Sequence, residues 1–238
     1  MRTKALVGAA GLAIALALGG CSAPGGAAQT GASSPTQTSA PAESYTPGQS
    51  VDTALLTAKM QAGSDSVKTM HVTMTMEGEL AADVVGDVDR SNPDKPAVSL
   101  TLTQKSGEQS LDYILIDGVT YISDDGAKTW TKDASDTSVS GAIQQQDKYL
   151  EYLTKAVYTG EETVNGATAR VFELTVELPS DASAELGGYK VWLDEHDRTV
   201  RYQMTSTVSD IKTVSDVTNS KFNEPVTITA PPSSQVTG

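Results

Sequence analysis

The sequence predicts one α+β domain in which a strongly curved antiparallel β-sheet carries helices against one side. Three observations predict this fold. Val and Thr are abundant and favour strands. Apolar and polar residues alternate with a period of two in many segments, and hairpin-type turns separate these segments. Only two stretches show helical periodicity. Because hairpin-joined strands with few helices are typical of antiparallel α+β domains, we expect about eight to eleven strands and two helices.

The first 20 residues have the features of a secretory signal peptide. Two basic residues precede an apolar and small-residue run over residues 5–18. This run is shorter than the roughly 20 helical residues that cross a bilayer, so it is typical of a signal peptide rather than a membrane span. The run leads into Leu-Gly-Gly-Cys at residues 18–21, and Cys21 is the only cysteine in the chain. A lone thiol cannot form an internal disulfide, so another use is expected for it.

The Leu-Gly-Gly-Cys motif resembles the lipobox of bacterial lipoproteins. The resemblance implies that Cys21 receives a diacylglyceryl group and becomes the new N-terminus after cleavage. The protein would then be exported and held by its lipid on the outer face of the cell membrane. The alternative is an ordinary signal peptide followed by a free thiol.

Acidic residues outnumber basic ones by 30 to 17, which gives a formal net charge of −13. Removal of the signal peptide takes away Arg2 and Lys4 and no acid, so 15 basic residues and a charge of −15 remain. Nucleic-acid affinity comes largely from neutralisation of phosphates by basic side chains. We therefore expect no nucleic-acid partner, and we interpret the acidity as a means of keeping an exported protein soluble.

The composition divides the mature chain into three parts. Residues 21–50 are rich in Ala, Gly, Ser, Thr and Pro and lack the apolar residues that would offset ordering entropy, so we expect a flexible tether. Residues 51–230 contain the periodic segments and are expected to form the folded domain. Residues 231–238 are expected to be a disordered C-terminal tail.

The first periodic segment of the domain predicts a helix. Val51, Leu55, Leu56 and Met60 recur at helical spacing, and Gly63 is expected to end the helix.

The period then changes to two. Residues 70–76 alternate four apolar side chains with threonines, and residues 98–102 repeat the alternation. Asp117-Gly118 separates the apolar segments 111–116 and 119–122, which is a strong signal for a β-hairpin.

A second helix is predicted within Ser138 to Tyr158. Ile143, Leu150, Leu153 and Val157 are spaced by seven, three and four positions, which places them on one helix face.

Strand patterns resume around Glu161 and continue to the end of the domain. Asn165-Gly166 predicts a hairpin turn, and a charged turn separates two further apolar segments. The expected strands of this half are residues 172–178, 189–193, 200–204 and a last one within 214–222, with the charged turn at 194–198.

The sequence contains no recognisable catalytic set. It has two histidines, no Gly-x-Ser-x-Gly elbow and a single cysteine that is expected to be lipidated. Residues 194–197 could hold a cation, but hairpin turns are commonly charged. Asp87 begins a calcium-loop pattern that fails at Asn92 and Val98, where Gly and Glu belong. We expect no enzyme activity, no cofactor and no metal site.

Several short motifs occur in the order found in a known family. They are Ser66 to Val72, Ile116 to Tyr121, Val164 to Gly166, Tyr189 to Asp194 and Phe222 to Pro231. With the lipobox, this order resembles the LppX/LprG lipoproteins (LppX, LprA, LprF and LprG) of mycobacteria and related actinobacteria, which are similar in fold to LolA and LolB.

The resemblance implies a half-open antiparallel sheet, an incomplete barrel, with helices packed on its concave side. It also implies an apolar cavity that holds the acyl chains of lipids or glycolipids. The candidate lining residues are Leu55, Met70, Val72, Met74, Met76, Leu100, Leu102, Leu150, Leu153, Phe172, Leu174 and Val176. The alternative is that these side chains fill a closed core.

Our leading hypothesis is a monomeric lipoprotein that carries acyl chains across or within the cell envelope, with a membrane lipid transporter as a candidate partner. The alternative is an anchored interaction or sensory module without lipid cargo, because a fold alone does not determine a function.

Overall fold

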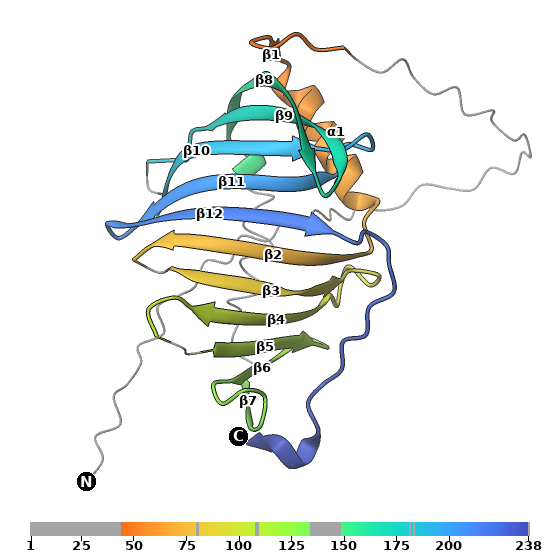
Figure 1. Cartoon of the computed structure of the whole chain (residues 1–238), viewed down its shortest axis with the longest axis vertical. Helices are drawn as coiled ribbons and strands as arrows, with labels where there is room; N and C mark the ends of the chain where they lie inside the picture. The colour runs from red at the N-terminus through yellow and green to blue at the C-terminus, as the bar shows by residue number, and fades with distance from the viewer. Residues whose placement is uncertain are drawn as a thin grey trace, which may run out of the picture.

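In the computed structural model, the described residues form one curved sheet of thirteen strands together with one long helix (Figure 1). The structure describes residues 44–79, 81–107, 110–133, 149–180, 182 and 184–237. The elements in chain order are β1 (Ser50–Val51), α1 (Thr53–Asp65), β2 (Thr69–Gly78), β3 (Ala82–Asp89), β4 (Ala97–Gln104), β5 (Ser110–Ile116), β6 (Val119–Ser123), β7 (Trp130–Asp133), β8 (Leu153–Val164), β9 (Ala167–Val176), β10 (Ala184–Leu193), β11 (Thr199–Val208), β12 (Ile211–Ser220), the 3-10 helix η1 (Ser233–Gln235) and β13 (Val236–Thr237).

The sheet consists of two meanders joined along one seam. Its strand order is β1-β8-β9-β10-β11-β12-β2-β3-β4-β5-β6-β7-β13. Every neighbouring pair is antiparallel except β7 with β13. The meander β2 to β7 and the meander β8 to β12 meet where β12 pairs with β2, with Val217 opposite Met74. The predicted fold class, an open and strongly curved antiparallel sheet, is confirmed.

Two predicted hairpin turns are confirmed. Ile116 pairs with Val119, and Asp117 and Gly118 both have positive φ, at 53° and 76°. Positive φ at both central residues is the geometry of a type I′ turn, which matches the twist of the strands it joins. Asn165-Gly166 joins β8 to β9 with φ values of 52° and 80°.

Helix α1 extends past the glycine that was expected to end it. Asp52 caps its start, since the carboxylate accepts a hydrogen bond from the Leu55 amide at 2.8 Å. Gly63 lies inside the helix, and Ser66 follows it as the C-terminal cap. A Cβ at Gly63 would lie 2.3 Å from the backbone oxygen of Asp197. Gly63 therefore serves close packing of the helix against the turn between β10 and β11, not helix termination.

The prediction of a helix from Ser138 to Tyr158 is wrong from Leu153 onward. Leu153–Val164 is strand β8, paired with β9 on one side and β1 on the other. Residues 149–151 are helical, and Ile143 lies outside the described residues. The apolar spacing that predicted a helix was overridden by pairing with the following strand β9 and with the distant strand β1.

The folded domain is longer at both ends than predicted. Tyr45, expected in the tether, packs its ring against Tyr158 and Phe172 at centroid distances of 5.4 and 5.6 Å. Residues 231–237, expected as a disordered tail, form η1 and β13. Val236 pairs in parallel with Trp130, which fixes the C-terminal segment to the sheet edge. Residues 1–43, with Cys21 and the predicted signal peptide, lie outside the described residues.

Candidate functional site

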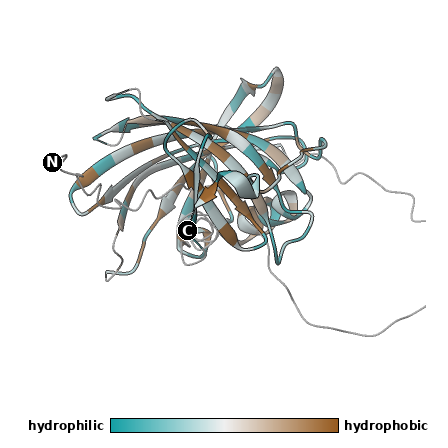
Figure 2. Ribbon diagram, turned by 90° about the horizontal axis from the view of Figure 1, so that it is seen from below, coloured by the Kyte–Doolittle hydropathy of each residue, from teal (hydrophilic) through white to brown (hydrophobic). Residues whose placement is uncertain are grey.

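The two faces of the sheet differ in polarity, and we call the face toward which the sheet curves its inner face. Figure 2 shows hydrophobic and hydrophilic residues alternating along the strands of the arch. Alternation sends successive side chains to opposite faces. Strand β2 illustrates this, because its four apolar side chains are at most 2% exposed, whereas Thr73 and Thr75 are exposed.

One buried cluster covers the inner face. It includes side chains from ten strands, β1 to β5 and β8 to β12, together with Leu56 and Met60 of α1. Five methionines belong to it, and this is an unusually adaptable kind of apolar surface because a Met side chain has three rotatable bonds. The five are Met60, Met70, Met74, Met76 and Met204.

The structure brings most of the predicted lining residues together. Nine of them belong to the buried cluster, and Leu150 and Leu153 are partly buried and pack against it. Leu55 does not, since its side chain is 44% exposed, whereas the neighbouring Leu56 is 1% exposed. The nine buried residues are Met70, Val72, Met74, Met76, Leu100, Leu102, Phe172, Leu174 and Val176.

Aromatic side chains complete the inner face, and Phe172 is the one among them that the sequence analysis selected. Tyr45, Tyr158 and Phe172 form a trio with centroid distances of 5.4–5.6 Å. Tyr189 and Tyr202 meet edge to face at 6.3 Å. Their signal in the sequence was the period of two, because Tyr189 and Tyr202 share parity with the buried Val191 and Met204.

The outer face carries a smaller apolar cluster, centred on Trp192. Trp192 is 1% exposed and packs with Val164, Ala169, Val171 and Val200 beneath the β8–β9 hairpin.

Charged groups surround the Trp192 indole. The Lys190 ammonium and the Arg201 guanidinium lie 4.7 and 4.6 Å from the ring centroid. The indole N–H donates to Glu162 at 2.9 Å. This hydrogen bond, followed by one from Lys190, lowers the pKa of Glu162.

A polar groove of about 530 Å³ lies on the outer face between the hairpin tip and the seam of the sheet. Arg201 donates to both oxygens of Asp216, at 2.9 and 2.6 Å, and Gln203 donates to Asp216 at 2.7 Å. Burial opposes ionisation of Asp216, but the hydrogen bonds from Arg201 and Gln203 hold its pKa below the usual value. The groove is lined by Thr73, Thr75, Glu77, Thr163, Val164, Asn165, Arg201, Gln203, Val214, Asp216 and Thr218.

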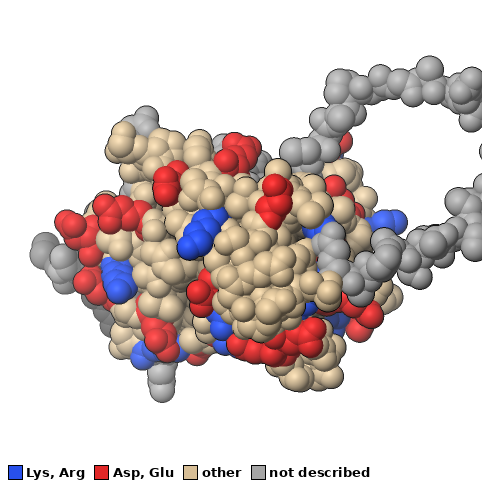
Figure 3. Space-filling view, turned by 90° about the horizontal axis from the view of Figure 1, so that it is seen from above, with Lys and Arg blue, Asp and Glu red and all other residues tan. Residues whose placement is uncertain are grey.

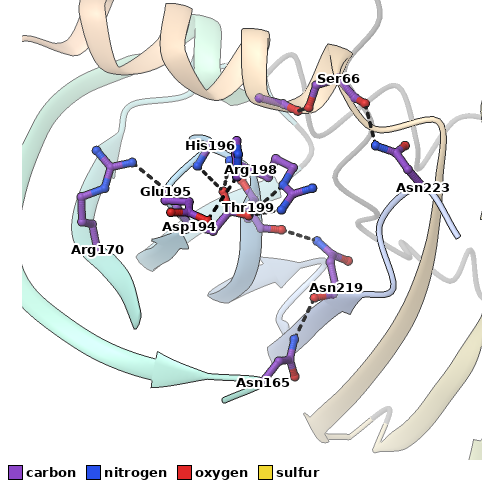
Figure 4. Close-up of polar contacts among 11 residues, drawn as sticks. Ser66, Asn165, Arg170, Asp194, Glu195, His196, Arg198, Thr199, Asn219 and Asn223 are labelled. Carbon is purple, nitrogen blue, oxygen red and sulfur yellow. Dashed lines mark hydrogen bonds and ion pairs between the residues drawn. The ribbon is translucent and has the colours of Figure 1, made fainter. Parts of the chain in front are cut away.

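The charged turn at residues 194–198 is an internally bonded structural unit (Figure 4). The Asp194 carboxylate accepts hydrogen bonds from the backbone amides of His196 and Arg198 and from the Arg198 guanidinium. Arg170 donates to the Asp194 carbonyl and to Asp197. Within the ranges that the structure describes, no group of three or more His, Cys, Asp or Glu residues is placed to hold a metal.

The acidic segment that begins the calcium-loop pattern at Asp87 belongs to a strand that is paired on both sides. Asp87 lies in β3, a strand that was not predicted, and its carboxylate is 2.7 Å from His71 Nδ1 on the neighbouring strand. Asp83 of the same strand accepts from Thr75. The alternating aspartates thus lie on the outer face of a strand rather than in a calcium loop.

The charged residues of the chain are predominantly acidic. Figure 3 shows acidic side chains spread over the upper face, with basic side chains interspersed among them. In the part of the chain that the structure describes, no helix has the length and apolarity needed to cross a membrane.

Comparison with solved structures identifies proteins of the same fold. The lipoprotein LppX of Mycobacterium tuberculosis matches with a TM-score of 0.53 and 22% identity, over 74% of this chain and 99% of LppX. LprF of Mycobacterium bovis matches with a TM-score of 0.53 and 13% identity, over 75% of this chain and 97% of LprF. The chain has the LppX/LprF fold. The resemblance predicted from the sequence is therefore confirmed at the level of fold. No protein-family model and no curated protein matches the sequence.

In this LppX-type sheet, the inner face is chemically simple. Most of its buried side chains are apolar or aromatic, and the buried polar residues Thr213, Ser215 and Asn219 lie on β12, at the seam. Such a surface can bind by removing apolar groups from water, without specific polar contacts.

Proposed function

We propose that this protein is a membrane-anchored lipoprotein that binds acyl chains against its inner face and carries lipids or glycolipids across or within the cell envelope. The observation that supports this most directly is the large buried apolar cluster of the inner face, with its five methionines. Each methylene that leaves water stabilises a complex by about 0.8 kcal/mol. A long acyl chain would therefore bind such a surface firmly, and methionines would adapt to its shape.

The N-terminal region supports the same proposal. The Leu-Gly-Gly-Cys motif would attach a lipid at Cys21, and the described domain begins at residue 44. A flexible tether over residues 22–43 would have an average reach of roughly 25 Å. The domain would then act close to the outer face of the membrane, where it could receive cargo from a membrane lipid transporter.

Native mass spectrometry of the chain from Ser22 onward, purified from its own host, tests the proposal. We expect adducts that organic extraction identifies as lipids, and we expect the emptied protein to take up lipid from vesicles. If the purified protein carries no lipid and the emptied protein takes up none, the proposed carrier function is wrong.

Met74→Trp is expected to lower lipid occupancy. Met74 is 2% exposed on the inner face, at the middle of β2 and opposite Val217. An indole there would occupy space used by an acyl chain and change the free energy of unfolding by no more than about 1–3 kcal/mol, the usual effect of overpacking. Lipid occupancy by mass spectrometry and thermal unfolding of the same samples measure both effects.

The matched control is Val85→Trp, because Val85 lies on the outer face and is 43% exposed. Its occupancy should equal that of the wild type. Full occupancy in Met74→Trp would contradict binding at the inner face.

Cys21→Ala is expected to abolish membrane anchoring. Without the thiol no diacylglyceryl group can be attached. Stable anchoring needs the two acyl chains of that group, since one chain alone gives only marginal membrane binding. Fractionation of cells should find the variant in the medium or as an uncleaved precursor. A cleaved variant that still sediments with membranes would show that Cys21 is not the anchor.

A second candidate function is an anchored interaction module. The outer groove favours it, since Arg201, Gln203 and Asp216 present polar groups beside the exposed Thr73 and Thr75. A photo-crosslinking residue at Thr75 tests this function in cells. Crosslinking to one envelope protein, in a preparation whose inner face carries no lipid, would favour the module over the carrier.

A further inference from the structure

The hydroxyl of Tyr202 is an unpaired polar group within the apolar inner face. Tyr202 is 0% exposed in β11, between Val191 of β10 and Val217 of β12. Its ring meets the ring of Tyr189 edge to face, with centroids 6.3 Å apart. Among the residues that the structure describes, none forms a hydrogen bond with Tyr202 Oη. Because buried hydroxyls are normally paired, this one requires an explanation.

In this buried position the Tyr202 hydroxyl can act as a hydrogen-bond donor. Burial, together with the neighbouring Tyr189, raises the pKa of Tyr202 well above its ordinary value, so the phenol stays neutral at physiological pH. A neutral phenol donates one hydrogen bond and is matched by a strong acceptor such as a carbonyl oxygen. The cluster to which it belongs consists of hydrophobic and aromatic side chains, and the buried Ser215 and Asn219 of β12 lie on the same face as Val217.

We propose that Tyr202 Oη donates a hydrogen bond to the carbonyl oxygen of an acyl group bound against the inner face. This inference rests on the proposed carrier function and specifies its ligand as an acyl carbonyl compound, either an acyl ester or a free fatty acid. An apolar surface holds a hydrocarbon chain without fixing its position along its length. One buried donor fixes that position, because only one placement of the chain brings the carbonyl to the hydroxyl.

The test compares lipids that differ only at the carbonyl. The chain from Ser22 onward is offered mixed vesicles of dipalmitoyl phosphatidylcholine and its dihexadecyl ether analogue in equal amounts, and native mass spectrometry measures the bound ratio. One hydrogen bond corresponds to a preference for the ester of about five- to tenfold. In Tyr202→Phe we expect the ratio to fall to about one.

Palmitic acid in a separate arm distinguishes the two sources of the carbonyl. Reduced uptake of palmitic acid by Tyr202→Phe would include the free acid among the ligands. Unchanged uptake together with a lost ester preference would assign the contact to esters alone.

Tyr121→Phe is the matched control, since Tyr121 lies in β6 and does not belong to the inner-face cluster. It should keep the ester preference. Ligand-free Tyr202→Phe should unfold at the same temperature as the wild type or higher, because an unpaired polar group has been removed.

Three outcomes would overturn this inference. The first is equal binding of ester and ether by the wild type, and the second is an unchanged ester preference in Tyr202→Phe. The third is a lower unfolding temperature of Tyr202→Phe, because this would show that the hydroxyl is already paired inside the protein. Each of them leaves acyl-chain binding itself intact. Failure of the wild type to bind any lipid would instead overturn the proposed function.

Discussion

Trp192→Ala is expected to destabilise the domain by about 3–5 kcal/mol, the usual effect of deleting a buried indole. Trp192 is 1% exposed and joins β10 to the β8–β9 hairpin on the outer face. Its loss would leave a cavity there and remove one of the hydrogen-bond donors to Glu162. It would also remove the ring against which Lys190 and Arg201 pack. Urea unfolding followed by far-UV circular dichroism measures the change.

Two further variants calibrate that result. Trp192→Phe keeps a ring between the two cations and should lose distinctly less stability than Trp192→Ala. Val85→Ala, at a position 43% exposed on the same face, should stay within about 0.5 kcal/mol of the wild type. A loss below about 1 kcal/mol in Trp192→Ala would mean that the outer cluster does not hold the hairpin to the sheet.

Gly63→Ala is expected to destabilise the domain by about 2 kcal/mol or more, although Ala is the better helix former by about 1 kcal/mol. A Cβ at this position would lie 2.3 Å from Asp197 O, 2.5 Å from Asp197 C and 2.8 Å from Arg198 N. These are backbone atoms of a turn held by the Asp194 carboxylate, so the turn cannot easily yield. Helix α1 would have to move away from the sheet.

Gly188→Ala is the matched control for Gly63→Ala. Gly188 lies in β10, and among the described residues other than its two chain neighbours no atom lies within 4 Å of the position that its Cβ would take. The same chemical change should therefore be neutral or slightly stabilising there. If both variants have the same midpoint urea concentration of unfolding as the wild type, the close packing of α1 on the β10–β11 turn is not important for stability.

The strands that the sequence predicted well are those in which one face is buried and the other is polar. In β2, β4 and the β5–β6 hairpin, alternation and turn residues specify the same register, so local information is sufficient. The turn residues Asp117 and Gly118 adopt the positive φ that their residue types favour.

The elements that the sequence did not predict depend on a partner distant in the chain or carry only a weak pattern of their own. Strand β8 is fixed by β9 and by β1, which lies about a hundred positions earlier. The strands β1 and β13 have two residues each and carry no pattern of their own. In β3, the aspartates on the outer face and Gly86 hide the alternation that buries Val84 and Val88.

The sequence predicted that an apolar inner face exists, but it did not identify all the residues that form this face. A strand pattern states which residues share a face, and for Met70 to Met76 this was sufficient. A helix pattern leaves the rotation of the helix uncertain by one position. It therefore could not show that Leu56, and not Leu55, is the buried residue. The pairing of Tyr189 with Tyr202, and the isolation of the Tyr202 hydroxyl, depend on packing between strands and could not be deduced from spacing.

The two-meander arrangement has a consequence for the order in which the chain folds. Within each meander, neighbouring strands are joined by connections that are short compared with the whole chain, so each meander can begin to form by local pairing. The seam is different, because β12 pairs with β2 across almost the whole domain sequence. Pairings between distant segments form slowly, since the ordering of a long loop precedes the gain from contact. A chain exported from its N-terminus would therefore complete its inner face only after residues 211–220 had crossed the membrane, and until then the apolar faces of both meanders would be exposed outside the cell.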